Sequence, residues 1–313
     1  MNVTILGSGA YGTALSCMFR ENNCNIKMWD KFDNKFQELK QEYPDTTFTT
    51  NMKASLTDTD LIVIAIPIPF LESSIIELKK YYNNEDILIA SKGINISDGL
   101  FAHEIIQKHL NVENIGAISG GTFAIDMKNK NVMGITLGTT SDKLIAKVKK
   151  SLANDYLKVQ YTKDMIGVEI CGSIKNVIAI GYGILAGANY PESTRFLYLT
   201  KAIYEINNFI EKQNGSPKTI MSYAGIDDIA MTSTGEKSRN HTLGKLIGKN
   251  ASKEEIDAYK NSTTIEGLET SKAIYNLAKR KNISLEICTI IYNILYNNYQ
   301  QESLIEYLKK SES

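Results

Sequence analysis

The sequence is poor in residues that mark several classes of protein. Its 313 residues include only five prolines, four cysteines and one tryptophan, and 43% are hydrophobic. This composition excludes a fibrous or disordered chain. The cysteines show no CxxC or Cys/His spacing, so we expect buried free thiols and no metal site or disulfide framework. They are Cys17, Cys24, Cys171 and Cys288.

Excess charge and a membrane-spanning run are also missing. Lys plus Arg number 35 and Asp plus Glu number 35, so no global field would attract nucleic acid or an anionic membrane. The apolar run 61–71 is interrupted by Pro67 and Pro69 and is shorter than the roughly 20 residues that span a bilayer. We interpret it as a buried strand with its exit loop. No secretory signal precedes the first strand, so we expect a cytoplasmic protein.

Two patterns of hydrophobic residues divide the chain near residue 160. Before it, short β-rich runs alternate with helically spaced segments, which predicts an α/β, doubly wound domain over 1–163 with a mostly parallel sheet covered on both faces. After it, apolar residues three and four apart predict an all-helical domain over 164–313, with a cleft expected between the two. Strands are expected at 3–6, 26–29, 61–66, 87–90, 115–119, 132–137 and 157–161. Helices are expected at 13–21, 32–42, 72–81, 100–109, 141–154, 166–185, 195–212, 265–280 and 285–298.

A glycine-rich motif, G-x-G-x-x-G, joins the first predicted strand to the first predicted helix at residues 7–12. Gly7 allows a tight turn, Gly9 lets backbone amides approach a pyrophosphate, and Gly12 allows close packing of helix on strand. The helix N-terminus then offers free N–H groups to the anion. The motif predicts a dinucleotide site, and the alternative is a chance glycine-rich turn.

Asp30 ends the second predicted strand, close to the roughly 20-residue offset at which a carboxylate binds the adenosine ribose. This position favours NAD as the cofactor. Lys31 beside it could accept a 2′-phosphate if Asp30 turned away, so NADP stays possible. A solvated Asp-Lys pair is the alternative interpretation.

Two further segments follow predicted strands, where a parallel sheet delivers residues to a ligand crevice. Lys92 follows the strand 87–90, and Thr122 lies in the small-residue run 118–124. Lys92 could equally be a lysine that extends from a strand end to solvent, and the run could be a tight turn without a ligand.

Lys175 is the most unusual ionisable residue, because it lies in a predicted helix that is apolar for about twenty residues. Burial would lower the pKa of its ammonium group and suit it to exchange a proton with a reacting hydroxyl. It could instead lie at the helix edge or pair with Glu169.

A polar cluster follows in the helical half, formed by Asp227-Asp228, Thr232 and Ser238-Arg239-Asn240. Such groups can orient a cation, an alcohol and a phosphate together, with arginine as the planar donor to phosphate oxygens. Helix capping by Asp227 or Ser238 would explain the same spacing. The three histidines, His103, His109 and His241, show no metal or triad spacing, and we expect them at the surface or at helix ends.

Together these motifs resemble the NAD(P)-dependent sn-glycerol-3-phosphate dehydrogenase family, most closely its bacterial soluble branch. The resemblance rests on GSGAYGTALS, SKGI, SGGTFA, GVEICGSIKNVIAI, GIDDIAMTST, SRN and IEG, which occur in the family's order over nearly the whole chain. It implies a Rossmann-like domain, an all-helical domain, a homodimer, and reversible reduction of dihydroxyacetone phosphate that supplies glycerol 3-phosphate for phospholipid synthesis.

The resemblance also implies roles for individual residues. The catalytic lysine and its supporting aspartate correspond to Lys175 and Asp228. Substrate contacts correspond to Lys92, Gly120, Thr122, Lys175, Asn176, Asp228, Thr232, Ser238, Arg239 and Asn240, with Arg239 at the phosphate. Cofactor contacts correspond to Ala10, Tyr11, Lys31, Lys92, Ala124, Arg239 and Glu266, beside Gly7, Gly9, Gly12 and Asp30 from the motif.

Four positions depart from the family pattern. Gly121 replaces a proline, Lys201 replaces an arginine that a glycine follows, Asp227 replaces a glycine, and Asp30 replaces a small residue. The first three leave open a related phosphorylated hydroxyketone or polyol phosphate as substrate. They also leave open a nucleotide-binding regulatory protein that has lost catalysis.

Overall fold

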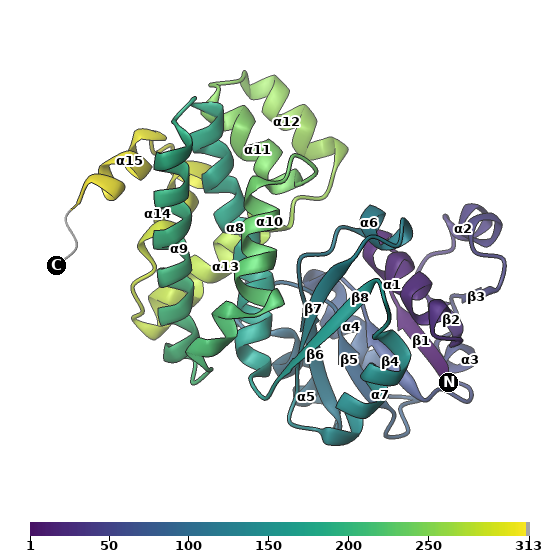
Figure 1. The fold of residues 1–313 in the computed structure, drawn as a ribbon. Coiled ribbons are helices and arrows are strands. Elements are labelled where there is room, and N and C mark those ends of the chain that lie inside the picture. Colours follow the sequence, from purple (N-terminus) through teal and green to yellow (C-terminus); the bar gives the residue numbers. More distant parts are fainter. Residues whose placement is uncertain (311–313) are drawn as a thin grey trace. The chain divides into compact units, whose positions relative to one another are not determined.

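A computed structural model describes residues 1–310 as two compact units (Figure 1). Unit 1 comprises Met1–Lys92 and Phe101–Val168. Unit 2 comprises Gly93–Leu100 and the chain from Glu169 onward. The linear division after residue 163 places the segment 93–100 in the first domain, whereas the structure packs it with the helices of unit 2.

Unit 1 is built on one eight-stranded sheet with the order β3-β2-β1-β4-β5-β6-β7-β8. All neighbouring strands are parallel except β6 and β7, which pair antiparallel. The chain leaves β1 for β2 and β3 on one side and returns to β4 on the other, so the strand order reverses at β1. The strands are β1 (Asn2–Leu6), β2 (Asn25–Trp29), β3 (Thr46–Thr49), β4 (Leu61–Ile64), β5 (Asp86–Ile89), β6 (Ile115–Ser119), β7 (Met133–Gly138) and β8 (Leu157–Thr162).

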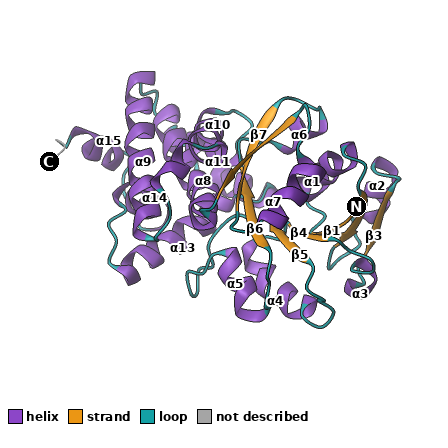
Figure 2. Ribbon diagram, turned by 60° about the horizontal axis from the view of Figure 1, so that its bottom comes forward, coloured by secondary structure: helices purple, strands orange, loops and turns teal. Residues whose placement is uncertain are grey.

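Helices cover both faces of this sheet, as predicted (Figure 2). One face carries α1 (Ala10–Glu21), α6 (Ala124–Lys128) and α7 (Asp142–Leu152), and the other carries α4 (Ile68–Leu78) and α5 (Ala102–His109). Val3, Ile5 and Val63 alternate along β1 and β4 and share a buried core with helix residues such as Leu15 and Leu144. The near-continuous apolar strands are therefore explained by burial on both sides.

Three short elements of unit 1 are missing from the sequence prediction: β3, α3 (Met52–Ser55) and α6. The strand β3 has the sequence TTFT, which is too short and too polar to be recognised as a strand from the sequence. It pairs with β2 at the edge of the sheet.

The expected exit loop at 61–71 is also corrected, because α4 begins at Ile68. Pro69 is tolerated there because the first turn of a helix needs no donor from it. The remaining helix is α2 (Phe36–Glu42).

Every regular element of unit 2 after Glu169 is a helix within the described residues, and these helices surround the buried helix α8 (Met165–Gly187). By length and composition α8 could cross a membrane, but 94% of its most apolar window is buried inside the structure. The other helices are α9 (Glu192–Lys212), α10 (Asp228–Thr234), α11 (Arg239–Gly248), α12 (Lys253–Ser262), α13 (Glu266–Lys281), α14 (Glu286–Tyr296) and α15 (Glu302–Lys309). A 3₁₀ turn, η1 (Pro217–Met221), and a π-helical turn, η2 (Tyr223–Asp227), lead into α10.

Glycines bring the backbones of α8 and α11 into direct contact. A Cβ atom on Gly183 would lie 2.2 Å from the carbonyl oxygen of His241, and one on Gly244 would lie 2.1 Å from that of Ile180. Gly187 and Gly248 repeat these approaches one turn further along. No side chain fits between the helices at these points, so the crossing fixes α11 on α8.

Candidate active site

The glycine loop of unit 1 has the geometry that its motif predicts. Gly7 has φ 111°, and a Cβ atom there would lie 2.5 Å from the carbonyl oxygen of Ala65. Gly9 has no atom within 4 Å of its Cβ position, so the space over it is open. Gly12 packs against the backbone of Gly7. The first glycine is required by the turn and the third by helix packing, which leaves the second to face a ligand.

The start of α1 offers donors to an anion. Gly9 is the N-cap residue in an extended conformation, and no side chain caps the helix. The first turn of α1 carries no acidic residue, so its N–H groups and the positive end of the helix dipole suit a pyrophosphate. These features fit a dinucleotide cofactor.

Asp30 folds back onto the glycine loop. Its Oδ2 accepts hydrogen bonds from the backbone N–H of Ser8 at 2.8 Å and from the Ser8 hydroxyl at 2.7 Å. Lys31 is exposed, with its ammonium 5.9 Å from the ring centroid of Phe32. Asp30 is thus held beside the loop with its other oxygen, Oδ1, weakly engaged by the N–H of Phe32 at 3.5 Å.

Lys92, Tyr11 and Thr122 meet within unit 1, although they come from three distant parts of the chain. The Lys92 ammonium lies 4.9 Å from the Tyr11 ring centroid, and the Tyr11 hydroxyl lies 3.3 Å from the hydroxyl of Thr122. Gly120 and Thr122 form a tight turn, with the Thr122 N–H donating to the Gly120 carbonyl at 2.7 Å. Ala124 follows as the first residue of α6.

Lys175 and Asp228 form a buried ion pair in unit 2. Their side chains are 8% and 0% exposed, and the Lys175 ammonium donates to Oδ1 of Asp228. Thr232, one turn along α10, donates from its hydroxyl to the same oxygen at 3.2 Å. The helix-edge position that the sequence left open is wrong for Lys175, because the side chain is buried and pairs with Asp228 of α10.

A chain of hydrogen bonds continues from the next residue of α8. Asn176 donates to the Glu266 carboxylate at 3.0 Å and accepts from the Asn240 amide at 2.9 Å. The Asn240 oxygen in turn accepts from the Gly267 backbone N–H at 3.0 Å. These bonds join α8, α11 and the start of α13, and they bring together three of the sequence-predicted site residues.

The remaining predicted residues lie around this chain. Ser238 is the N-cap of α11, where its hydroxyl accepts from the His241 backbone N–H at 3.3 Å, so the capping alternative is correct for Ser238. Arg239 is exposed and begins α11, and Asp227 is exposed and makes no capping hydrogen bond to α10. His241 lies at a helix end, as expected, in the first turn of α11, but it is buried and only 2% exposed.

Two residues with a part in this geometry were missed by sequence reasoning. Ser8 occupies a variable position of the glycine motif, yet the parallel pairing of β1 with β2 brings it beside Asp30. His241 lies three and seven residues before Gly244 and Gly248, which places all three on one face of α11. That helical spacing was a signal that could have found His241.

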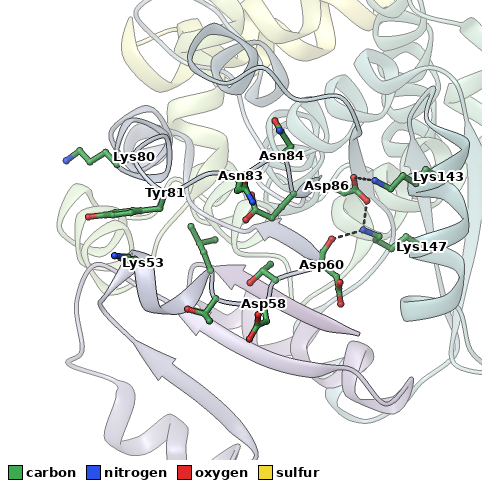
Figure 3. A pocket seen from close by; sticks show the side chains of 14 residues that line it. Lys53, Asp58, Asp60, Lys80, Tyr81, Asn83, Asn84, Asp86, Lys143 and Lys147 are labelled. Carbon is green, nitrogen blue, oxygen red and sulfur yellow. Dashed lines mark hydrogen bonds and ion pairs between the residues drawn. The ribbon is translucent and has the colours of Figure 1, made fainter.

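A hollow of about 850 Å³ lies in unit 1 at the amino ends of the central strands β4 and β5 (Figure 3). Lys92 and Thr122 follow the carboxyl ends of their strands instead. Asp86 is buried beside the hollow and is paired with Lys143 and Lys147, and Lys147 also donates to the Asp60 carbonyl at 2.6 Å. Burial raises the pKa of Asp86, but hydrogen bonds from the two lysines outweigh burial and lower it. None of the sequence-predicted site residues lines this hollow. Within residues 1–310 no cluster of three or more His, Cys, Asp or Glu could hold a metal.

Family models match almost the whole chain. Residues 2–145 match the N-terminal domain of NAD-dependent glycerol-3-phosphate dehydrogenase, and residues 164–306 match its C-terminal domain. The chain is 29% identical to the glycerol-3-phosphate dehydrogenase [NAD(P)+] of Staphylococcus aureus and 27% identical to that of Staphylococcus haemolyticus, with 99% of both partners covered in each comparison.

Solved structures share the fold. The glycerol-3-phosphate dehydrogenase of Coxiella burnetii superimposes with a TM-score of 0.93 at 24% identity, covering 99% of each chain. The yeast enzyme from Saccharomyces cerevisiae gives 0.86 at 21% identity, again over 99% of each chain.

Proposed function

The chain belongs to the NAD-dependent glycerol-3-phosphate dehydrogenase family, and we propose on that premise that it interconverts dihydroxyacetone phosphate and sn-glycerol 3-phosphate. When bound, NAD or NADP would supply or accept the hydride at C2. The observation that carries this proposal is the buried pair of Lys175 and Asp228, since a lysine without access to bulk water needs a reason to be charged there. A pure binding protein has no need for such a proton donor.

Lys175 donates a proton to the substrate carbonyl oxygen as hydride reaches C2, so that an alcohol forms instead of an alkoxide. Asp228 holds the Lys175 ammonium and favours its charged form, and the Thr232 hydroxyl holds Asp228 from the other side. In the oxidative direction Lys175 takes the same proton back. These roles follow from the contacts that Lys175 and Thr232 make with the same oxygen of Asp228.

The substrate phosphate is assigned to Arg239, which is exposed at the first turn of α11 and offers a planar set of donors. Further substrate contacts are proposed on residues that the resemblance indicates in both units. These are Lys92, Gly120 and Thr122 in unit 1 and Asn176, Ser238 and Asn240 in unit 2.

The cofactor pyrophosphate is assigned to the glycine loop, with Gly9, Ala10 and Tyr11 at the start of α1. Asp30 is assigned to the adenosine ribose, and its position favours NAD over NADP. The other proposed cofactor contacts are Lys31, Lys92, Ala124, Arg239 and Glu266.

A related phosphorylated hydroxyketone is the second candidate substrate. Gly121 supports it, because the turn between Gly120 and Thr122 forms without the rigid ring of a proline. Relative kcat/KM values on dihydroxyacetone phosphate and on its four-carbon and five-carbon phosphorylated analogues distinguish the two. The proposal requires dihydroxyacetone phosphate to be the best of them.

The cellular setting is part of the same proposal. We place the enzyme in the cytoplasm, as a homodimer that supplies glycerol 3-phosphate to phospholipid synthesis. Exposed apolar side chains on α9 and on η1, which packs against α9, support a partner surface: Leu197, Tyr204 and Met221. Sedimentation velocity measures the assembly state, and a monomer at micromolar concentration would refute the dimer.

The direct test of function is oxidation of NADH, followed at 340 nm, with and without dihydroxyacetone phosphate. We expect turnover that depends on the phosphorylated ketone, with glycerol 3-phosphate as the product by mass spectrometry. Unphosphorylated dihydroxyacetone is the matched control. NADH binding without turnover on any of the phosphorylated ketones would favour the regulatory alternative.

A further inference from the structure

His241 is a buried histidine that the proposed reaction does not use. It lies in the first turn of α11, and its Nδ1 is 2.6 Å from the backbone carbonyl oxygen of Ser233, near the end of α10. A carbonyl oxygen can only accept, so Nδ1 carries a hydrogen. The other nitrogen, Nε2, is buried and has no hydrogen-bond partner within residues 1–310.

The surroundings of the ring favour its neutral form. Tyr182 of α8 packs against it with ring centroids 5.9 Å apart, and the Arg195 guanidinium of α9 lies 5.6 Å from the Tyr182 ring. Burial lowers the pKa of His241, Lys245 and Arg195 lower it further, and the Ser233 carbonyl and Glu236 oppose them. A proton on Nε2 would be a buried donor without an acceptor.

The bond between His241 and Ser233 closes the corner between α10 and α11. On the α10 side, Ser233 follows Thr232, which holds Asp228. On the α11 side, His241 follows Asn240, which holds Asn176. Both arms end on Lys175 and Asn176, neighbours on α8. The corner therefore sets the spacing between the residues around the proton donor and those at the start of α11.

We propose that His241 is a positioning residue that holds the start of α11, with Arg239 and Asn240, in register with Asp228 and Thr232. This inference rests on the proposed function, because the spacing between Arg239 and Asp228 matters only if the site binds a phosphorylated ketone. The bond needs a hydrogen on Nδ1, which the ring carries in both its neutral and its charged form. A second proton, on the buried Nε2, would have no acceptor, so the corner between α10 and α11 should loosen as pH falls.

Three variants separate this role from simple packing. His241→Leu fills space without a donor, and His241→Asn places an amide donor near the position of Nδ1. His109→Leu is the control, since His109 is hydrogen-bonded to Glu72 and is not among the predicted site residues. We expect His241→Leu to raise KM for dihydroxyacetone phosphate about tenfold with a smaller change in kcat. His241→Asn should restore most of the affinity, and the NADH dissociation constant should stay nearly unchanged.

The pH profile supplies a readout that packing alone would not move. In the wild type, KM for the ketone should rise on acidification below the ordinary histidine value of 6.5, and in His241→Asn this component should vanish. The substrate phosphate titrates equally with both enzymes, so the ratio of their KM values cancels it. An unchanged KM in a folded His241→Leu enzyme, or no rescue by asparagine, would overturn the inference. A wild type inactive on dihydroxyacetone phosphate would instead overturn the proposed function.

Discussion

The two units place their candidate site residues by different physical means. In unit 1 these residues follow strand ends, so the parallel sheet alone brings Tyr11, Lys92 and Thr122 to the same edge. In unit 2 they lie on α8, α10, α11 and α13 and are aligned by side-chain hydrogen bonds. A sheet edge tolerates substitution at single positions, whereas a hydrogen-bonded set of helices depends on each member. Loss of the Lys175–Asp228 pair in unit 2 should therefore affect chemistry, whereas loss of Asp30 in unit 1 should affect the choice of cofactor.

Lys175→Met should have the largest effect and should leave unit 1 untouched. Loss of general acid catalysis lowers kcat by roughly 10²- to 10⁴-fold, while the NADH dissociation constant stays near its wild-type value. Stopped-flow turnover and NADH fluorescence titration measure the two quantities. Asp228→Asn is the matched variant and should cost less in the same parameter. Wild-type turnover in Lys175→Met would show that the lysine is structural.

Arg239→Lys sharpens the comparison within unit 2, because it should affect binding instead of proton transfer. Replacing the planar guanidinium should raise KM for dihydroxyacetone phosphate by roughly 10- to 100-fold, the worth of a hydrogen bond to a charged group. Unphosphorylated dihydroxyacetone should lose much less. Steady-state kinetics on both ketones decides this, and equal losses would remove Arg239 from the phosphate site.

Asp30→Ala is the corresponding change in unit 1. In the proposed site the Asp30 carboxylate would bind ribose hydroxyls and repel a 2′-phosphate, so its loss should shift the NADH-to-NADPH preference roughly tenfold toward NADPH. Lys31 becomes available to the extra phosphate. The ratio of kcat/KM for the two cofactors is the measurement. Ser8→Ala tests whether the hydrogen bond from the Ser8 hydroxyl to Asp30 contributes to cofactor preference. A wild type that already prefers NADPH by tenfold would contradict this view of Asp30.

Glu205→Gln should have the smallest effect and concerns stability alone. Glu205 of α9 accepts from the backbone N–H groups of Ile287 and Cys288 at the start of α14, at 2.8 and 3.0 Å. Burial raises its pKa above 4.5 despite these bonds. The folded state therefore holds this proton more tightly, and its contribution to stability falls as pH rises from 4.5 through the folded pKa. In thermal melts between pH 4 and 8, the fall in stability with rising pH should be smaller in Glu205→Gln than in the wild type. The same pH dependence in both proteins would contradict this role of Glu205.

The same contrast explains what the sequence could predict. The glycine loop and Asp30 are local signals tied to the order of strands and helices, so the loop and most strands of unit 1 are confirmed. The strand β3 was missed because its four residues gain their order from pairing with β2.

In unit 2 the helices were predictable but their side-chain partners were not. Lys175 had two candidate carboxylates, and Glu169 is nearer in sequence. Six residues along a helix do not return to the same face, and only the fold brings Asp228 beside the lysine. The role of His241 was missed because a hydrogen bond to a backbone carbonyl requires no particular residue type at its partner position, so no sequence pattern indicates it.

The glycine contacts between α8 and α11 have a mechanical consequence. Helices separated by side chains can slide slightly as rotamers change, but backbones in contact have no such compliant layer. Gly183 and Gly244 therefore make the two helices one stiff body, with Lys175 and Asn176 on one and Asn240 on the other. Substrate-dependent movement within unit 2 should then be confined to segments outside this body, such as the turn that carries Lys237. Hydrogen exchange should be slowest along the glycine face and should stay slow when substrate binds.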